Sequence, residues 1–186
     1  MKKTISFLLS LLFVLSFASC GKEEAAPVDY ISEGMKTQLK MLVMANLNFN
    51  SSVYTSSTLK ADDSNPVEKD GVKWLPVKDS RFTSYDDFLI SLNAVYTSEC
   101  IEKILEDYDY YADIDGVFCI KADAVKSQDS EKWEMDASFN TTVVSKKDDK
   151  ISVRYNFIKG KQTKKQTYTF VNTSSGYRLD KFYKLG

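Results

Sequence analysis

The chain has 186 residues, with 25 Lys and Arg against 26 Asp and Glu, so its formal net charge is −1. That length fits one domain, and a hydrophobic content of 43% can fill a core. The chain has no His, which excludes Ser-His-Asp and Cys-His nucleophile systems and every metal site built on imidazole. The glycines are too scattered for a phosphate-binding loop, and balanced charge argues against nucleic acid, which needs a clustered basic face. We therefore expect no metal and no other cofactor.

The N-terminal segment has the composition of a secretory signal. Lys2 and Lys3 precede an apolar run over residues 5–17, and the small residues Ala18 and Ser19 follow it. A membrane-spanning helix needs about 20 apolar residues, so this run is too short to span comfortably. The pattern indicates export of the chain.

The Ala-Ser-Cys-Gly sequence around Cys20 resembles the lipobox of bacterial lipoproteins, in which the cysteine is diacylated and the chain is cut before it. The resemblance implies a signal peptide over 1–19, a palmitate-bearing Cys20 and a spacer over 20–30. The alternative is an ordinary cleaved signal in which Cys20 is incidental. Because two acyl chains hold a protein firmly at a bilayer, we expect a lipid anchor on the extracytoplasmic face of the cell membrane. The preference for Lys over Arg favours a low-GC Gram-positive source.

Residues 31–186 predict a single α+β domain, with N-terminal helices packed on a meandering antiparallel β-sheet. Apolar residues at helical spacing predict a helix that begins at Asp29 or Ser32 and continues to about Asn48. Serines, threonines and β-branched residues then predict a strand over 49–59.

Turn and capping residues predict the next elements. Gly71 indicates a hairpin between Val67 and the run 72–75. Ser84, with an aspartate three residues later, predicts the start of one helix, and Thr97 predicts the start of a second.

After Gly116 the apolar period changes from helical to two, as in strands with one buried face. Turns are expected at 147–150, 160–161 and 173–176. The strands expected between them are 117–121, 133–141, 151–157, a strand that includes 168–170, and 177–182.

Two cysteines remain in the exported domain. Cys100 lies in a helical apolar pattern and Cys119 in an apolar run. An oxidising compartment permits a disulfide between them, and two buried thiols acting as small hydrophobic residues are the alternative.

Acidic residues surround three tyrosines between 106 and 115. Asp113 and Asp115 with Gly116 match the start of a calcium loop, but the later Glu that such a loop requires is missing. A hairpin turn explains this pattern better. The acidic, tyrosine-rich segment predicts a surface for recognition, and acid–base chemistry by paired carboxylates is the alternative.

Four segments together resemble the bacterial inhibitors of peptidoglycan DL-endopeptidases and lipoproteins grouped with them. The segments are WLPVKDSRF (74–82), SYDDF (84–88), VYTSE (95–99) and DIDG (113–116). The resemblance covers roughly residues 59–185 and implies a non-enzymatic protein that plugs the catalytic cleft of an NlpC/P60-type cell-wall hydrolase.

We therefore expect partner contacts on the two loops of this resemblance and at the start of the intervening helix. The candidate contact residues are Asp79, Arg81, Phe82, Tyr85, Asp113 and Asp115.

Two other functions stay open. Helices before a curved sheet also resemble lipoproteins of the nuclear-transport-factor-2 type, which implies a deep apolar pocket for a small ligand inside the sheet. An enzyme that uses only carboxylates and tyrosines needs two inward-facing carboxyl groups roughly 5–9 Å apart.

Overall fold

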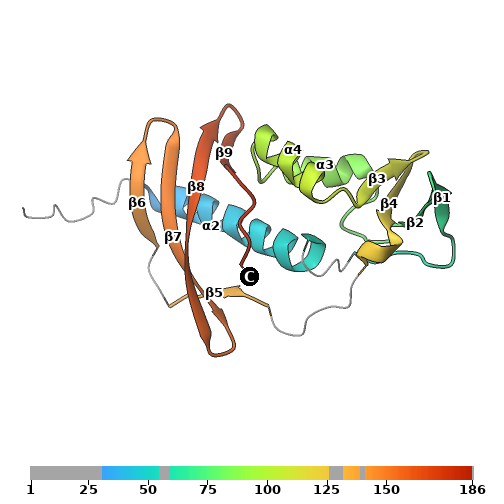
Figure 1. The fold of residues 1–186 in the computed structure, drawn as a ribbon. Coiled ribbons are helices and arrows are strands. Elements are labelled where there is room, and N and C mark those ends of the chain that lie inside the picture. The colour runs from blue at the N-terminus through green and yellow to red at the C-terminus, as the bar shows by residue number, and fades with distance from the viewer. Residues whose placement is uncertain (1–30, 55–58, 126–131, 139–140, 186) are drawn as a thin grey trace, which may run out of the picture.

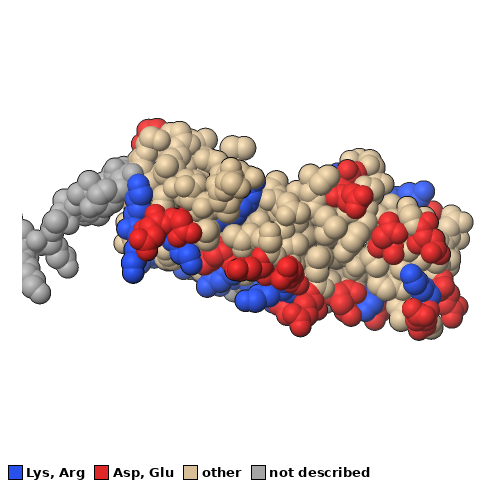
Figure 2. Space-filling model, turned by 90° about the horizontal axis from the view of Figure 1, so that it is seen from above, with Lys and Arg blue, Asp and Glu red and all other residues tan. Residues whose placement is uncertain are grey.

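The computed structural model describes residues 31–54, 59–125, 132–138 and 141–185. The predicted signal peptide, the spacer, Asp29 and Cys20 lie outside these residues. The α+β class is confirmed, but the strands form two antiparallel sheets instead of one meander. The two sheets lie toward opposite ends of an elongated molecule, and a long helix runs behind the larger sheet toward the other end (Figure 1). Acidic and basic side chains are interspersed along one long side of the molecule (Figure 2).

The long helix α2 spans Glu33–Phe49. The Ser32 side chain caps it by accepting a hydrogen bond from the Met35 backbone N–H at 3.2 Å, as one of the two predicted caps. Leu39, Val43 and Leu47 recur at helical spacing and are all buried, so this face of α2 packs into the core.

A π-helical turn, Asn50–Tyr54, follows α2 directly. The strand predicted over 49–59 is therefore wrong over this turn, and residues 55–58 lie outside the described residues. The turn is kept helical by tertiary contacts that the local composition does not contain. The Tyr111 hydroxyl donates to the Val53 carbonyl at 2.6 Å, and the Tyr110 hydroxyl donates to the Tyr54 carbonyl at 3.0 Å. These bonds satisfy backbone acceptors that a helix end leaves open.

The smaller sheet has the strand order β1-β2-β4-β3, and two tight hairpins build it. Asp70 and Gly71 have φ of 53° and 74°, and Asp115 and Gly116 have φ of 53° and 83°. Positive φ at both central residues is the geometry of a type I′ turn, so both predicted hairpins are confirmed. The strands are β1 (Val67–Lys69), β2 (Val72–Pro76), β3 (Tyr111–Ile114) and β4 (Val117–Lys121).

Two short helices, α3 (Tyr85–Asn93) and α4 (Ser98–Asp107), separate β2 from β3 in the chain. Both begin where predicted. Ser84 caps α3, because its hydroxyl accepts from the Asp87 N–H at 3.0 Å, and the Thr97 hydroxyl caps α4. A one-turn 3₁₀-helix, η2 (Ala122–Ala124), follows β4.

The larger sheet has the order β5-β7-β8-β9, with β6 also paired to β7. The predicted alternation appears in β7, where Ile151, Val153, Tyr155 and Phe157 are all buried. Of the strand predicted over 133–141, residues 139 and 140 lie outside the described residues. In the described part only β5 is a strand, because the Asp136 side chain accepts from the Ser138 N–H and forms a turn. The strands are β5 (Glu134–Met135), β6 (Thr142–Lys147), β7 (Lys150–Lys159), β8 (Gln162–Thr173) and β9 (Gly176–Leu179).

One continuous hydrophobic cluster runs from Ile31 to Leu185 and includes residues of both sheets and of α2, α3 and α4. A buried amide closes it. The Asn46 side chain donates to the Tyr183 carbonyl at 2.9 Å, while its oxygen accepts from the Tyr183 N–H and the Tyr96 hydroxyl, both at 3.1 Å. The C-terminal segment is thereby fastened to α2.

Within the described residues, no helix combines the length and apolar character needed to cross a membrane.

Candidate functional site

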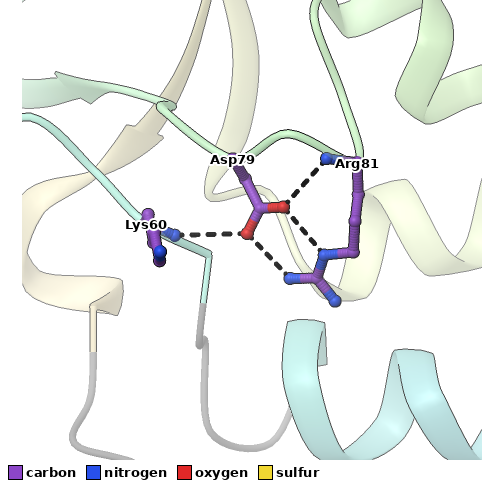
Figure 3. Close-up of polar contacts among 3 residues, drawn as sticks. All are labelled: Lys60, Asp79 and Arg81. Carbon is purple, nitrogen blue, oxygen red and sulfur yellow. Dashed lines mark hydrogen bonds and ion pairs between the residues drawn. The ribbon is translucent and has the colours of Figure 1, made fainter.

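The loop after β2 is organised around the carboxylate of Asp79. This carboxylate accepts from Arg81 Nε at 2.8 Å, from Arg81 Nη2 at 2.9 Å and from the Arg81 backbone N–H at 3.1 Å. It also accepts from the Lys60 backbone N–H at 3.4 Å, which ties the loop to a segment before β1 (Figure 3). This bidentate contact between the carboxylate and the guanidinium fixes both side chains in one geometry. The loop is therefore held in shape by its own residues.

The charges of this pair are unequally exposed. The Asp79 side chain is 9% exposed and the Arg81 side chain 36% exposed. Hydrogen bonds from the Arg81 side chain lower the pKa of Asp79 to about 2, and the Asp79 carboxylate raises the pKa of Arg81. Asp79 is thus an internal support, and Arg81 is the member of the pair that reaches solvent.

Phe82 does not lie on the surface. Its side chain is buried, and its ring packs edge-on against Phe88 with 5.4 Å between centroids. The prediction of Phe82 as a contact residue is therefore wrong, because an aromatic side chain beside an apolar helix face gains more from the core than from solvent. The Arg81 guanidinium carbon lies 5.7 Å from the Phe82 ring centroid, so Phe82 supports the exposed arginine from below.

Tyr85 and the β3–β4 hairpin lie close together. The half-buried Tyr85 ring packs 5.6 Å from Phe118 of β4. Burial, and then the negative charge of Asp113, raise the pKa of Tyr85, so its hydroxyl stays protonated at neutral pH. Asp113 accepts from the Gly116 N–H at 2.8 Å, and Asp115 is exposed in the same turn.

Arg81, Tyr85, Asp113 and Asp115 thus remain as surface candidates around one buried aromatic layer. The layer itself links the two loops, because Phe118 of β4 packs against both Phe82 and Tyr85. Such a surface presents a guanidinium, a phenol and two carboxylates, which suits recognition of a polar partner. In the described residues no group of three or more His, Cys, Asp or Glu side chains could hold a metal ion.

Cys100 and Cys119 are both free and buried. They are therefore not joined in a disulfide, and each acts as a small buried hydrophobic residue. Cys100 belongs to the main core, whereas Cys119 packs with Trp74 and Ile114 in a second, smaller cluster. Burial raises the pKa of the Cys100 thiol to about 12, which makes it a poor nucleophile.

A polar groove of about 850 Å³ was missed by the sequence reasoning. Its walls come from the α3–α4 link, the β6–β7 turn and the β8–β9 hairpin, so no local motif marks it. Arg178 lines it and is fixed by a hydrogen bond from its Nε to the Asn93 carbonyl at 2.7 Å. Polar side chains also line it, among them Thr97, Glu99 and Asp180.

The inner face of the larger sheet bears on the small-ligand alternative. Val153, Phe157, Tyr168 and Phe170 on this face have no exposed surface. They belong to the same continuous cluster as the inner face of α2, which runs behind the sheet (Figure 1). In the described part of the chain, side chains therefore occupy the region where that alternative expects an apolar pocket.

Comparison with protein-family models and with curated proteins gives no match for this chain.

Proposed function

We propose that the protein is an extracytoplasmic lipoprotein, anchored in the cell membrane through lipidated Cys20, whose domain binds and inhibits a cell-wall DL-endopeptidase without being an enzyme. The anchor is supported by the lipobox-like sequence at Cys20. The partner class is supported by the four resembling segments between 74 and 116.

The observation that carries this proposal is the self-supported loop of Asp79 and Arg81. A protein that plugs a cleft loses less binding free energy when the inserted segment is ordered before binding. Asp79 accepts three hydrogen bonds from Arg81 and one from the Lys60 backbone. Arg81 is thereby presented in a fixed position over Phe82, which shares its contact with Phe118 of the β3–β4 hairpin with Tyr85.

Binding is tested with the mature chain, residues 20–186, carrying Cys20→Ser to prevent acylation. We expect saturable inhibition of at least one NlpC/P60-type hydrolase of the same organism. Arg81→Ala should weaken inhibition at least tenfold, because it removes the exposed charge, while Lys161→Ala in the distant β7–β8 turn should leave inhibition unchanged. If no such hydrolase of the organism binds the folded domain, the proposed partner is wrong.

Anchoring is tested separately in cells. The unchanged chain should incorporate labelled palmitate and sediment with membranes, and Cys20→Ala should do neither. Recovery of the unchanged, cleaved protein from the medium without palmitate would instead support an ordinary secretory signal.

A further inference from the structure

The two faces of the larger sheet differ in character. Along β7, Ile151, Val153 and Tyr155 point into the core that the sheet shares with α2. Because successive side chains of a strand point to opposite faces, the residues between them lie on the other face, which we call the outer face. Ser152 of β7 and Thr169 of β8 lie opposite each other on it, with 3.1 Å between their hydroxyl oxygens. In the described part of the chain, no residue of the outer face is buried, and α2 lies behind the sheet, against the opposite face (Figure 1).

Five cationic side chains lie on the outer face. They are Lys147 of β6, Lys150 and Arg154 of β7, Lys165 of β8 and Arg178 of β9. The pairing of the strands places Lys147 directly opposite Lys150, and Val171 of β8 lies between Lys150 and Arg178. Arg154 and Lys165 lie further along the sheet, in two successive rows about 7 Å apart. The cations are therefore spread over two dimensions of the face and do not follow one line.

Carboxylates lie at the margins of the outer face. Glu134 of the short strand β5 shares the face, Asp148 and Asp149 lie in the β6–β7 turn at one end, and Asp180 follows β9. The three lysines and Arg154 are exposed or half-buried and form no ion pair with a carboxylate of the described residues.

Positive charge is concentrated in this part of the chain. Residues 142–179 carry nine Lys and Arg against two Asp, in a chain whose formal net charge is −1. An anionic partner that approaches the larger sheet would therefore meet a positive potential, and one that approaches the rest of the molecule would not.

The arrangement of the cations favours a charged surface over a single polymer chain. A nucleic acid strand is bound through its phosphates and by stacking of its bases on aromatic rings, and the described strands place no aromatic side chain on the outer face. A linear polyanion needs a track of cations, whereas these cations extend over four strands in several rows. The hydroxyls of Ser152 and Thr169 between the rows can donate hydrogen bonds to phosphate oxygens.

The predicted lipid anchor brings such a surface within reach. The eleven residues 20–30 can span at most about 40 Å. They lead to α2, whose N-terminal end lies at the larger sheet (Figure 1). A short tether raises the effective concentration of the membrane around the sheet, so that individually weak contacts suffice.

We propose that the outer face of the larger sheet lies against the anionic phospholipid surface of the membrane in which the protein is anchored. Each Lys or Arg close to such a surface is attracted by its negative potential. The smaller sheet and the loop of Arg81, toward the other end of the molecule, then stay free to bind a partner (Figure 1). The inference rests on the proposed lipid anchor for the closeness of the membrane.

The test uses residues 20–186 carrying Cys20→Ser, which contain every described residue and no acyl chain. We expect saturable cosedimentation with vesicles of equal parts phosphatidylglycerol and phosphatidylcholine, and at least tenfold weaker binding to pure phosphatidylcholine vesicles. Salt at about 0.5 M should release the protein, because it screens the attraction over a few Å.

Variants assign the face. Arg154→Glu combined with Lys165→Glu should weaken binding to the anionic vesicles at least tenfold. Lys69→Glu combined with Lys73→Glu makes the same change in net charge at exposed positions of the smaller sheet and should leave binding within twofold. Thermal unfolding shows whether each variant is folded. Lys147→Gln combined with Lys150→Gln removes two charges from the outer face by a milder change and should weaken binding several-fold.

Three results would overturn the proposal. They are equal binding to both kinds of vesicle, equal loss of binding in the variants of the two sheets, and binding of soluble poly(glycerol phosphate) without binding to vesicles. A protein that binds anionic vesicles through this face but carries no palmitate in cells would keep the membrane-binding face and lose the proposed anchor. Absence of hydrolase inhibition would remove the proposed partner and leave this face unaffected.

Discussion

At the scale of single residues, the best-defined interaction is the ion pair of Asp79 and Arg81. Its contribution depends on pH with a known sign. The folded-state pKa of Asp79 is about 2, below the value of about 3.9 for an unfolded aspartate. The stabilisation is therefore fully present above about pH 4 and is lost as the pH falls toward 2. Because Arg81 is 36% exposed, solvent screening reduces the net effect to about 1–2 kcal/mol.

We predict that Asp79→Asn lowers the free energy of unfolding by about 1–2 kcal/mol at pH 7. The difference from the unchanged protein should shrink as the pH is lowered from 4 to 2, because the native carboxylate is then protonated as well. Urea unfolding at several pH values measures this. Glu102→Gln, at an exposed position of α4, serves as control and should stay within about 0.5 kcal/mol throughout.

At the scale of elements, α3 depends on its first turn. The helix has nine residues, which is too short to be stable by itself in water. Ser84 accepts from the Asp87 N–H, and the Asp87 carboxylate accepts in return from the Thr83 N–H at 3.1 Å. This reciprocal pair fixes the start of α3 and thereby the position of Phe88, whose ring lies 5.4 Å from that of Phe118.

We predict that Ser84→Ala destabilises the protein by about 1 kcal/mol, whereas Ser84→Gly costs only a few tenths. Glycine retains much of the capping preference, so the pair of variants separates loss of the cap from loss of side-chain volume. The midpoint of urea denaturation gives both values. If Ser84→Ala were as stable as the unchanged protein, the cap would not stabilise α3.

At the scale of the whole molecule, Asn46 joins three distant parts of the chain. It lies in α2, accepts from Tyr96 in the link between α3 and α4, and bonds both backbone groups of Tyr183. Asn50 adds a second donor to the Tyr183 carbonyl at 2.9 Å. Asn46 is fully buried. If its side chain were removed, the groups that it binds could not form hydrogen bonds with water instead.

Asn46→Leu should therefore lower the free energy of unfolding by about 3 kcal/mol or more, because it leaves the Tyr183 N–H and the Tyr96 hydroxyl unpaired. Lys40→Ala, an exposed position of the same helix, should change it by less than about 0.5 kcal/mol. Urea unfolding compares the two. A small effect of Asn46→Leu would mean that the C-terminal segment is held by other contacts.

The confirmed predictions of structure rest on patterns within short stretches of sequence. The hairpins at Gly71 and Gly116 and the alternation in β7 depend only on neighbours in sequence. The π-helical turn could not be read in this way, because the hydroxyls that hold it come from residues more than 50 positions later in the chain. The burial of Phe82 likewise depends on packing against Phe88 and Phe118.

The candidate sites show the same limit. Sequence located the loop of Arg81 and the turn at Asp113, but only the fold showed that a shared aromatic layer supports both. The acidic, tyrosine-rich segment at 106–115 was anticipated, and the fold adds two residues to it. Asp123 follows the segment by eight positions and lies on η2, whereas Tyr54 lies more than 50 positions before it and reaches it through the π-helical turn.

The bonds between α2 and Tyr183 also bear on the order in which the protein folds. They join residues 133 and 137 positions apart in the chain, and Leu185 is buried in the same core as Ile31. Contacts between such distant residues form slowly, because a long loop has to close first. The hairpins and short helices can therefore form early, while the core that they pack against is completed only when the two distant segments meet.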